Sequence, residues 1–412
     1  MENVFDIKRE KKLNYVLPTN VALGEVDYSN HKVLVIIHLY YQDTIDEYMY
    51  YVENIPEEID LIFTVSNNAI KQCIDDRVKT IRKNYRFVHK ENRGRDISAF
   101  LVACREIILD YEYVCFLHDK KEKSPDYYID NRQWVGCLWE NTLGSMSYIK
   151  NILWTLQTNE EIGVLVPPLP MSAHYSTAYT NSWGANFKNV VSLSKELNLI
   201  CDLDETKNPI TIGTVFWVKV EAVKKLFERN WNYNDFPQEP LDNDGTISHA
   251  IERSFAYIAQ DAGFVTGWTM TDKFASDRME LMNDTMSKMS HILSERCHVH
   301  SIADVEKFDE DMDRLDDFIR KNSLIYIYGA GRMAKIYRNR LGLLGRFPDL
   351  YIVSKMNGNP EMIDKVPVVA IEDVDFSNKP GIIIGVGVKL KKEVLVQLKT
   401  ILGEAYTNIL IL

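Results

Sequence analysis

Four apolar segments separated by helix-like segments constrain the fold of residues 32–118 more than any other feature. The segments are KVLVIIHLYY, DLIFTVSN, YRFVHKEN and YEYVCFLH. The first is rich in β-branched residues, which is typical of a strand buried on both faces. Between the segments, apolar residues recur at intervals of three and four, which indicates helices. Strands that alternate with helices at this spacing predict an α/β fold with a doubly wound, mostly parallel sheet.

The carboxyl ends of these strands are where a ligand is expected, because ligands of open parallel sheets bind beyond them. A short polar segment follows each of the four strands. These segments are residues 38–41, 66–67, 92–96 and 118–124. We predict that they lie along one rim of the sheet.

The amino-acid composition and the spacing of apolar residues change after about residue 270. Residues 273–322 are polar, acid-rich and helical in spacing, and we interpret them as a helical connector. Residues 323–412 begin again with a strand and a glycine-rich turn, SLIYIYGAGRMAKIYRNRL, and continue with the strands LYIVS, GIIIGVGV and TNILIL. We predict a main domain over 1–272, the connector, and a second, smaller Rossmann-like α/β domain over 323–412 that folds independently.

Composition excludes several classes of protein. The net charge is −11 and no block of Lys and Arg interrupts it, which argues against a nucleic-acid partner. The six cysteines are scattered, as reduced thiols are. The longest apolar runs fall short of the roughly 18 residues of a membrane helix, and the first residues lack the apolar stretch of a signal peptide. We expect a cytoplasmic protein, and leave open a peripheral association with the inner face of the cell membrane.

The first candidate site is ENRGRDISAF. Gly94 permits a tight turn, Asp96 can cap the following helix, and Arg93 and Arg95 would face an anion such as a diphosphate at the helix start. A capped helix with solvated arginines explains the same residues equally well, because a capping carboxylate would occupy the place of the anion.

The second candidate site is FLHDKKEKS, at the carboxyl end of the fourth strand. Lys120, Lys121 and Lys123 beside His118 and Asp119 suit a phosphate or a leaving group. A solvated charged loop is the alternative, and the position on the predicted rim favours the functional interpretation.

The third candidate site is DGTISHAIERSF. Residues 244–246 predict a turn, and Thr246 can cap a helix in which His249 and Arg253 are four residues apart with Glu252 beside them. One helix face can therefore present all three side chains. A carboxylate or imidazole at hydrogen-bond distance is what a general base for a sugar hydroxyl requires. Ion pairing within the helix is the alternative.

Several short motifs together resemble the rhamnan synthesis protein F family, whose members are glycosyltransferase-type proteins of bacterial cell-surface polysaccharide assembly. The motifs are IHLYY, NRGRD, FLHDKK, GTVFWVK, FPQEP and DGTISHAIERSF, in this order between about residues 30 and 270. The resemblance implies a fold similar to the GT-A nucleotide-sugar transferases. In that class an Asn-x-Gly turn at a helix start precedes a strand that ends in Asp-x-Asp, and Asn92 and Gly94 match the first motif.

The second motif differs in this chain, because His118, Asp119 and Lys120 stand where the class has Asp-x-Asp. Lysines can neutralise a diphosphate in place of a cation, so we expect no metal site. If the reaction does need Mg²⁺ or Mn²⁺, His118 and Asp119 are the expected ligands. The full set of predicted donor-binding residues is His38, Tyr40, Asn92, Arg93, Gly94, Arg95, Asp96, His118, Asp119, Lys120, Lys121 and Arg253.

The turn YGAGRMAK is the fourth candidate site. Gly329, Gly331 and Ala334 form G-x-G-x-x-A after a strand and before a helix, the context of dinucleotide binding. The next strand ends in residues 353–355, Val-Ser-Lys, without the acidic residue that would hold a ribose. Close packing of the helix on the strand explains the motif as well, and the ligand stays open. The CHVH segment, 297–300, has too few ligands for a zinc site.

These features predict a glycosyltransferase that moves a sugar from a nucleotide-diphosphate donor to a cell-surface polysaccharide or lipid-linked glycan, with L-rhamnose as one candidate sugar. Asp244 is the preferred base, followed by Glu252, with Glu239 and His249 as further candidates. Direct displacement with inversion is the simplest mechanism, because no nucleophile is evident. The alternatives are an NAD(P)-dependent oxidoreductase centred on GAGRMA and a non-catalytic scaffold that binds a nucleotide sugar.

Overall fold

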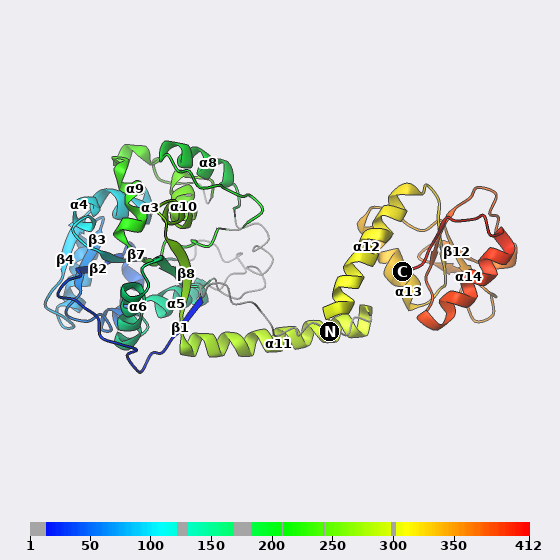
Figure 1. Cartoon of the computed structure of the whole chain (residues 1–412), viewed down its shortest axis with the longest axis horizontal. Helices are drawn as coiled ribbons and strands as arrows, with labels where there is room; N and C mark the ends of the chain where they lie inside the picture. The colour runs from blue at the N-terminus through cyan, green and yellow to red at the C-terminus, as the bar shows by residue number, and fades with distance from the viewer. Residues whose placement is uncertain (1–13, 122–130, 169–182, 208, 242–243, 298–301) are drawn as a thin grey trace. The chain divides into compact units, whose positions relative to one another are not determined.

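The computed structural model describes residues 14–121, 131–168, 183–207, 209–241, 244–297 and 302–412. The chain divides into two compact units, Met1–Leu281 and Met282–Leu412 (Figure 1). Each unit has its own sheet and its own hydrophobic core.

The first unit is built on an eight-stranded sheet with the order β1-β8-β6-β7-β5-β2-β3-β4. Its strands are β1 (Asn14–Leu17), β2 (Val33–His38), β3 (Asp60–Val65), β4 (Arg86–His89), β5 (Tyr113–His118), β6 (Ile162–Val166), β7 (Phe216–Lys219) and β8 (Val265–Thr271). Only β7 is antiparallel to its neighbours among these described strands. The four strands predicted from the sequence are β2 to β5, so the predicted α/β, mostly parallel sheet is confirmed.

Helices cover both faces of this sheet. One face carries α1 (Ile45–Val52), α2 (Asn68–Val78), α5 (Asn131–Leu143) and α6 (Met146–Thr158). The other face carries α3 (Arg95–Ser98), α4 (Arg105–Ile108), α8 (Phe187–Glu196), α9 (Lys224–Glu228) and α10 (Ile247–Asp261). A π-helical turn, Ala99–Ala103, joins α3 to α4.

The central strand β2 supplies both hydrophobic cores, because successive strand residues point to opposite faces. Val33, Val35 and Ile37 belong to the first core, and Leu34 and Ile36 belong to the second. All six residues of β2 are buried, as the continuous apolar run predicts. The residue that ends this strand is therefore held rigidly at the rim.

The second unit is a smaller α/β unit with the sheet order β11-β12-β10-β9-β13-β14. Its strands are β9 (Ile325–Tyr328), β10 (Leu350–Val353), β11 (Met362–Ile363), β12 (Val366–Ala370), β13 (Gly381–Ile384) and β14 (Ile409–Leu410). Only the β11–β12 pair is antiparallel in this sheet as described. Its helices include α13 (Arg332–Leu343) and α14 (Val388–Leu402). The sequence predicted β9, β10, β13 and β14 but not the β11–β12 hairpin.

Two helices occupy the segment predicted to be a connector, α11 (Asp272–Cys297) and α12 (Ile302–Lys321). Met312, Leu315 and Ile319 of α12 are buried in the core of the second unit. Asp316 also accepts two hydrogen bonds from the Arg340 guanidinium of α13, at 2.7 and 2.6 Å. α12 is therefore part of the second unit's packing as well as a connection.

Five of the cysteines are free thiols, as expected: Cys73, Cys104, Cys115, Cys137 and Cys201. Burial raises the pKa of Cys104 and of Cys137 to about 12, so these two thiols are unreactive at neutral pH. None of the described helices has both the length and the apolar character needed to cross a membrane.

The packing of α12 gives the predicted domain boundary at residue 323 a specific test. We expect residues 302–412, expressed alone, to unfold in one cooperative thermal transition. We expect residues 323–412 to give a broad transition or none, because burial of an apolar side chain is worth about 1.5–3 kcal/mol and three are lost with α12. Circular dichroism during heating measures both. Equal, cooperative transitions of the two fragments would show that α12 is dispensable.

Candidate active site

The ends of β2 and β5 bring two histidines together at the centre of the first sheet. His38 and His118 are the last residues of these strands, and they are register partners in the β2–β5 pair. β3 and β4 follow on one side of β2, whereas the chain returns on the other side of it with β5. This reversal of strand order is where doubly wound sheets bind ligands. The predicted rim segments 38–41 and 118–121 thus meet at this point.

Asp119 fastens the two strand ends to one another. Its carboxylate accepts hydrogen bonds from the backbone N–H groups of Tyr40 and Tyr41, at 2.8 and 2.7 Å, and its own N–H donates to the carbonyl of His38 at 3.1 Å. Burial raises the pKa of the Asp119 carboxyl to about 7, against the lowering effect of these N–H donors. Asp119 therefore holds the loop after β2 in place.

His118 is enclosed by acceptors. Its Nδ1 lies 2.8 Å from the carbonyl oxygen of Asp119, its Nε2 lies 2.8 Å from that of Gly213, and Nε2 is also 3.7 Å from an Asp96 carboxylate oxygen. Burial lowers the pKa of His118, while Asp96 and the two carbonyls act in the opposite direction. Both ring nitrogens are directed at protein oxygens, so a metal ion would have to displace one of these contacts.

Asp96 is a largely enclosed acid of the site, with 15% of its side chain exposed, and it does not cap a helix. The residue before α3 is Gly94, no side chain caps this helix, and Asp96 lies within it. Burial acts to raise the pKa of Asp96, but His118, Lys120 and a hydrogen bond from Thr214 outweigh it and lower the pKa to about 2. The expectation that Asp96 is a capping residue is wrong, because its carboxylate is engaged by β5 and by the segment before β7.

Two strained backbone turns surround Asp96. Gly94 and Arg95 have φ values of 74° and 47°, and Gly213 and Thr214 have φ values of 106° and 51°. A side chain on Gly94 would lie 2.6 Å from the Phe236 ring, so this turn requires glycine. Left-handed backbone is unfavourable for arginine and more so for a β-branched threonine. Strain of this kind persists where the surrounding structure enforces it, and it is concentrated at functional sites.

The two arginines of the NRGRD turn have different surroundings. Arg93 donates to the carbonyl of Phe236 at 2.6 Å and to the Asn234 side chain at 2.8 Å, so protein groups occupy its guanidinium. Arg95 donates one hydrogen bond to the carbonyl of Leu241 at 3.2 Å and lies 3.7 Å from a Glu239 oxygen. Arg93 thus holds the 234–236 segment, and Arg95 is the less constrained cation.

Lys90, which the sequence did not single out, is a buried cation beside the same rim. It directly follows β4, the residue is 2% exposed, and its ammonium donates to the carbonyl of Glu91 at 2.7 Å. Burial lowers the pKa of Lys90 to about 8, although Asp96 and Glu239 favour its charged form. In a sequence, a lysine directly after a strand suggests a side chain in contact with solvent. Only the tertiary structure shows that the side chain of Lys90 is buried.

His38 is neutral at physiological pH. Burial, followed by the charge of Lys90, lowers the pKa of His38 to about 3. Its Nδ1 lies 2.9 Å from the hydroxyl of Thr64 on β3. His38 is therefore a fixed, uncharged polar group between the second and third strands.

The remaining predicted donor-binding residues form the more open part of the rim. Tyr40 is 39% exposed, and its hydroxyl accepts a 3.4 Å hydrogen bond from the Asn92 amide. Lys121 forms an ion pair with Asp43, whereas Lys120 is only partly exposed and contributes to the low pKa of Asp96. Lys123, also predicted as a phosphate ligand, lies outside the described residues.

The DGTISHAIER segment begins α10 with a capping box. The predicted cap, Thr246, is confirmed, and the partner of its backbone N–H and hydroxyl is the Nδ1 of His249, with the hydroxyl at 2.8 Å. Burial lowers the pKa of His249, which keeps its ring neutral. His249 therefore has a structural role in capping the amino end of α10.

The two predicted carboxylate bases on this segment both have partners. Asp244 accepts from the Asn186 amide at 2.6 Å and from the Ala185 N–H at 3.1 Å, and its side chain is 38% exposed. Although burial acts to raise the pKa of Asp244, these donors and Arg253 lower it, so the carboxylate is ionised at neutral pH.

Glu252 connects this segment to the groups around His118 at the end of β5. Its carboxylate accepts the N–H of Gly213, the residue whose carbonyl faces His118, and its backbone carbonyl accepts the Thr211 hydroxyl at 2.8 Å. Arg253 lies between the two acids, 3.5 Å from an oxygen of Asp244 and 3.8 Å from one of Glu252. The structure therefore brings the three predicted segments of the first unit into one connected region.

In the second unit, the glycine-rich turn permits close packing. Gly329 has a φ of 123°, and a side chain there would collide with the carbonyl of Gly385. Ala334 is buried and packs against Gly385, whereas the space beside Gly331 at the start of α13 is open. The described geometry accounts for Gly329 and Ala334 by packing alone, so a ligand at this turn stays a prediction.

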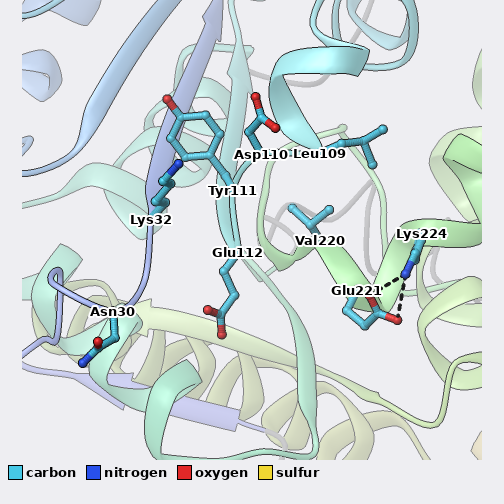
Figure 2. Close-up of a pocket in the computed structure, with 9 residues that line it drawn as sticks. All are labelled: Asn30, Lys32, Leu109, Asp110, Tyr111, Glu112, Val220, Glu221 and Lys224. Atoms are coloured by element: carbon cyan, nitrogen blue, oxygen red, sulfur yellow. Dashed lines mark hydrogen bonds and ion pairs between the residues drawn. The ribbon is translucent and has the colours of Figure 1, made fainter.

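A groove of about 420 Å³ lies at the end of the first sheet opposite to His38 and His118 (Figure 2). It is lined by residues that precede β2 and β5 and by those that follow β7, including Lys32, Glu112 and Glu221. Glu221 is paired with Lys224 at 3.2 Å. Because the groove lies at the amino ends of β2 and β5, it is not part of the candidate site.

The described residues contain no group of three or more His, Cys, Asp and Glu side chains arranged to hold a metal ion. The CHVH histidines, 298 and 300, lie outside the described residues. The expectation about metals therefore stays a prediction.

Comparison with known proteins matches most of the first unit. The family model described as rhamnan synthesis protein F matches residues 1–264, which end just before β8. Two relatives are 27% identical to this chain over 234 residues. Both are named uncharacterized protein WxcX, and they come from two different strains of Xanthomonas campestris pv. campestris. The alignment covers 56% of this chain and 31% of each relative, so the chain spans less than a third of their length. With its matched region extending through the whole candidate site, the chain belongs to the rhamnan synthesis protein F family.

Proposed function

We propose that the first unit is a glycosyltransferase that moves a sugar from a nucleotide-diphosphate sugar to a bacterial surface polysaccharide or a lipid-linked precursor of one. Family membership supports polysaccharide synthesis, and the proposal adds the transfer reaction, a GT-A-type donor site and L-rhamnose as a candidate sugar. A cytoplasmic donor pool would supply the nucleotide sugar.

The observation that carries this proposal is the convergence at the switch point of the first sheet. His38 and His118 are paired there, and Asp96 is held between two left-handed turns. The charged groups are enclosed by protein but lie at the end of the strands where a ligand approaches. Preorganised polar groups of this kind stabilise the charge that develops when a leaving diphosphate departs.

We assign the donor diphosphate to the cations Arg95 and Lys120, with the buried Lys90 as a further positive charge that interacts with Asp96. Arg95 stands at the strained turn that begins α3, and Lys120 follows the end of β5. Arginine binds phosphate oxygens in a bidentate manner, and lysine acts as a point charge. Arg93 receives a supporting role, because its guanidinium holds residues 234–236.

We predict that Arg95→Ala raises the dissociation constant for the nucleotide-sugar donor about 10- to 100-fold, the loss of a charge-assisted contact. Arg93→Ala is the matched control, and should lower the thermal midpoint while changing donor affinity about threefold or less. Titration calorimetry and thermal unfolding measure the two effects. Equal loss of affinity in both variants, with the fold intact, would return Arg93 to the donor site.

For the transfer step we retain Asp244 as the base that accepts the proton of the acceptor hydroxyl, with inversion at the sugar carbon. Its carboxylate is ionised and partly exposed, whereas the carboxylate of Glu252 is less exposed and bound to the Gly213 N–H. Direct displacement balances without a covalent intermediate: the bond from the sugar to the diphosphate breaks as the acceptor oxygen bonds to the sugar.

We predict that Asp244→Asn lowers kcat about 10²- to 10⁴-fold, the usual contribution of a general base. Glu252→Gln keeps an oxygen that accepts the Gly213 N–H and should retain kcat within about tenfold. Steady-state transfer assays, with the anomeric configuration of the product read by NMR, measure both. A larger loss of kcat in Glu252→Gln than in Asp244→Asn would exchange the roles, and a retained configuration would rule out direct displacement.

The metal expectation has its own test at Lys120. We predict that transfer continues in excess chelator but falls at least tenfold in Lys120→Ala, because the lysine supplies a positive charge to the leaving diphosphate. Lys121→Ala is the control, since that ammonium is paired with Asp43. Loss of transfer in chelator that is restored by Mg²⁺ or Mn²⁺ would contradict this and make His118 and Asp119 the candidate ligands.

A further inference from the structure

Helix α11 carries an exposed stripe of apolar side chains with regular spacing. Ala275, Met279, Met282, Met286, Met289 and Leu293 alternate in steps of four and three residues along this single helix, labelled α11 in Figure 1. Met279, Met282, Met286 and Met289 are 64%, 43%, 60% and 57% exposed. No hydrophobic core of the described residues includes any of the four.

The spacing is that of a coiled-coil seam. Steps of four and three average 3.5 residues, which keeps a narrow stripe facing a partner helix that winds around the first. A helix that packs on a globular core carries a broader apolar face, with a period of 3.6. Every residue from 281 to 290 has an exposed side chain in the described part of the chain. A helix that is solvated all round is only marginally stable in water, and packing of the apolar stripe against a partner would supply the missing stability.

The residues beside the stripe allow an identical helix to be the partner. In heptad terms the flanking positions are Ser276, Arg278, Asn283, Thr285, Ser290 and Ile292, of which only Arg278 is charged. Asp284 and Lys288 lie on the outer side of the helix and form an ion pair at 2.7 Å. Two copies of α11 can therefore meet along the stripe without opposing like charges, which otherwise select a different partner.

We propose that α11 forms a two-stranded coiled coil with the α11 of a second copy of this chain, and that the protein is a homodimer. The seam consists of Met279, Met282, Met286, Met289 and Leu293 from each copy, and flexible methionine side chains fill the space between the helices. The dimer is independent of the proposed transfer reaction.

Light scattering after size exclusion, together with sedimentation equilibrium of the full chain, tests this proposal. The expected mass is twice 47.8 kDa. Met286→Glu should raise the dimer dissociation constant about 100-fold or more, because it buries two like charges in the seam. Ser287→Glu adds the same charge to the adjacent outward position and should leave the dimer intact. Circular dichroism checks that both variants fold.

A wild-type protein that is monomeric at all accessible concentrations would overturn the proposal. So would a dimer that Met286→Glu and Ser287→Glu affect equally, because the interface would then lie elsewhere. Monomers that bind phospholipid vesicles through wild-type α11 but not through Met286→Glu would also overturn it, and would assign the stripe to a membrane surface.

Discussion

The hydrogen bonds of Asp119 hold the first unit's candidate site together. One carboxylate oxygen accepts from two consecutive backbone N–H groups after β2, while the backbone of the same residue continues β5. Two strands that are distant in sequence thus end at one fixed point. The positions of His38, His118 and the loop that carries Tyr40 all follow from this connection. Without a buried acceptor, those N–H groups would each lose a hydrogen bond, which typically costs about 1–3 kcal/mol.

Around this point, each element of the site is held by groups of another. The ring of His118 faces the carbonyl of Gly213, whose N–H is accepted by Glu252 at the second turn of α10. Asp96 is engaged by His118 and Thr214, and Arg93 fixes the segment that leads toward α10. A donor that displaced one of these contacts would also change the strength of the others, because the groups form one connected network of polar contacts. Such a network favours a site that is formed before the ligand binds.

The sequence predicted the framework of this unit but not the internal roles of its residues. Buried β-branched runs identify strands directly, and the chain order of β2 to β5 places their ends on one rim. The antiparallel β7 and the strained Thr214 leave no comparable pattern, because their geometry depends on contacts across the sheet. Arg93 and Arg95 look equivalent in NRGRD, and only their contacts separate them. Lys90 resembles any solvated lysine until the fold encloses it.

The most direct test of the account is hydrogen–deuterium exchange of the full chain, with and without a panel of nucleotide-diphosphate sugars. If the donor binds at the switch point, exchange slows in residues 92–98, 118–121 and 211–215, which surround Asp96. Residues 329–334 at the turn before α13 should be unchanged. Protection confined to that turn would move nucleotide binding to the second unit. Absence of protection with every sugar nucleotide tested would contradict a donor site between β2 and β5.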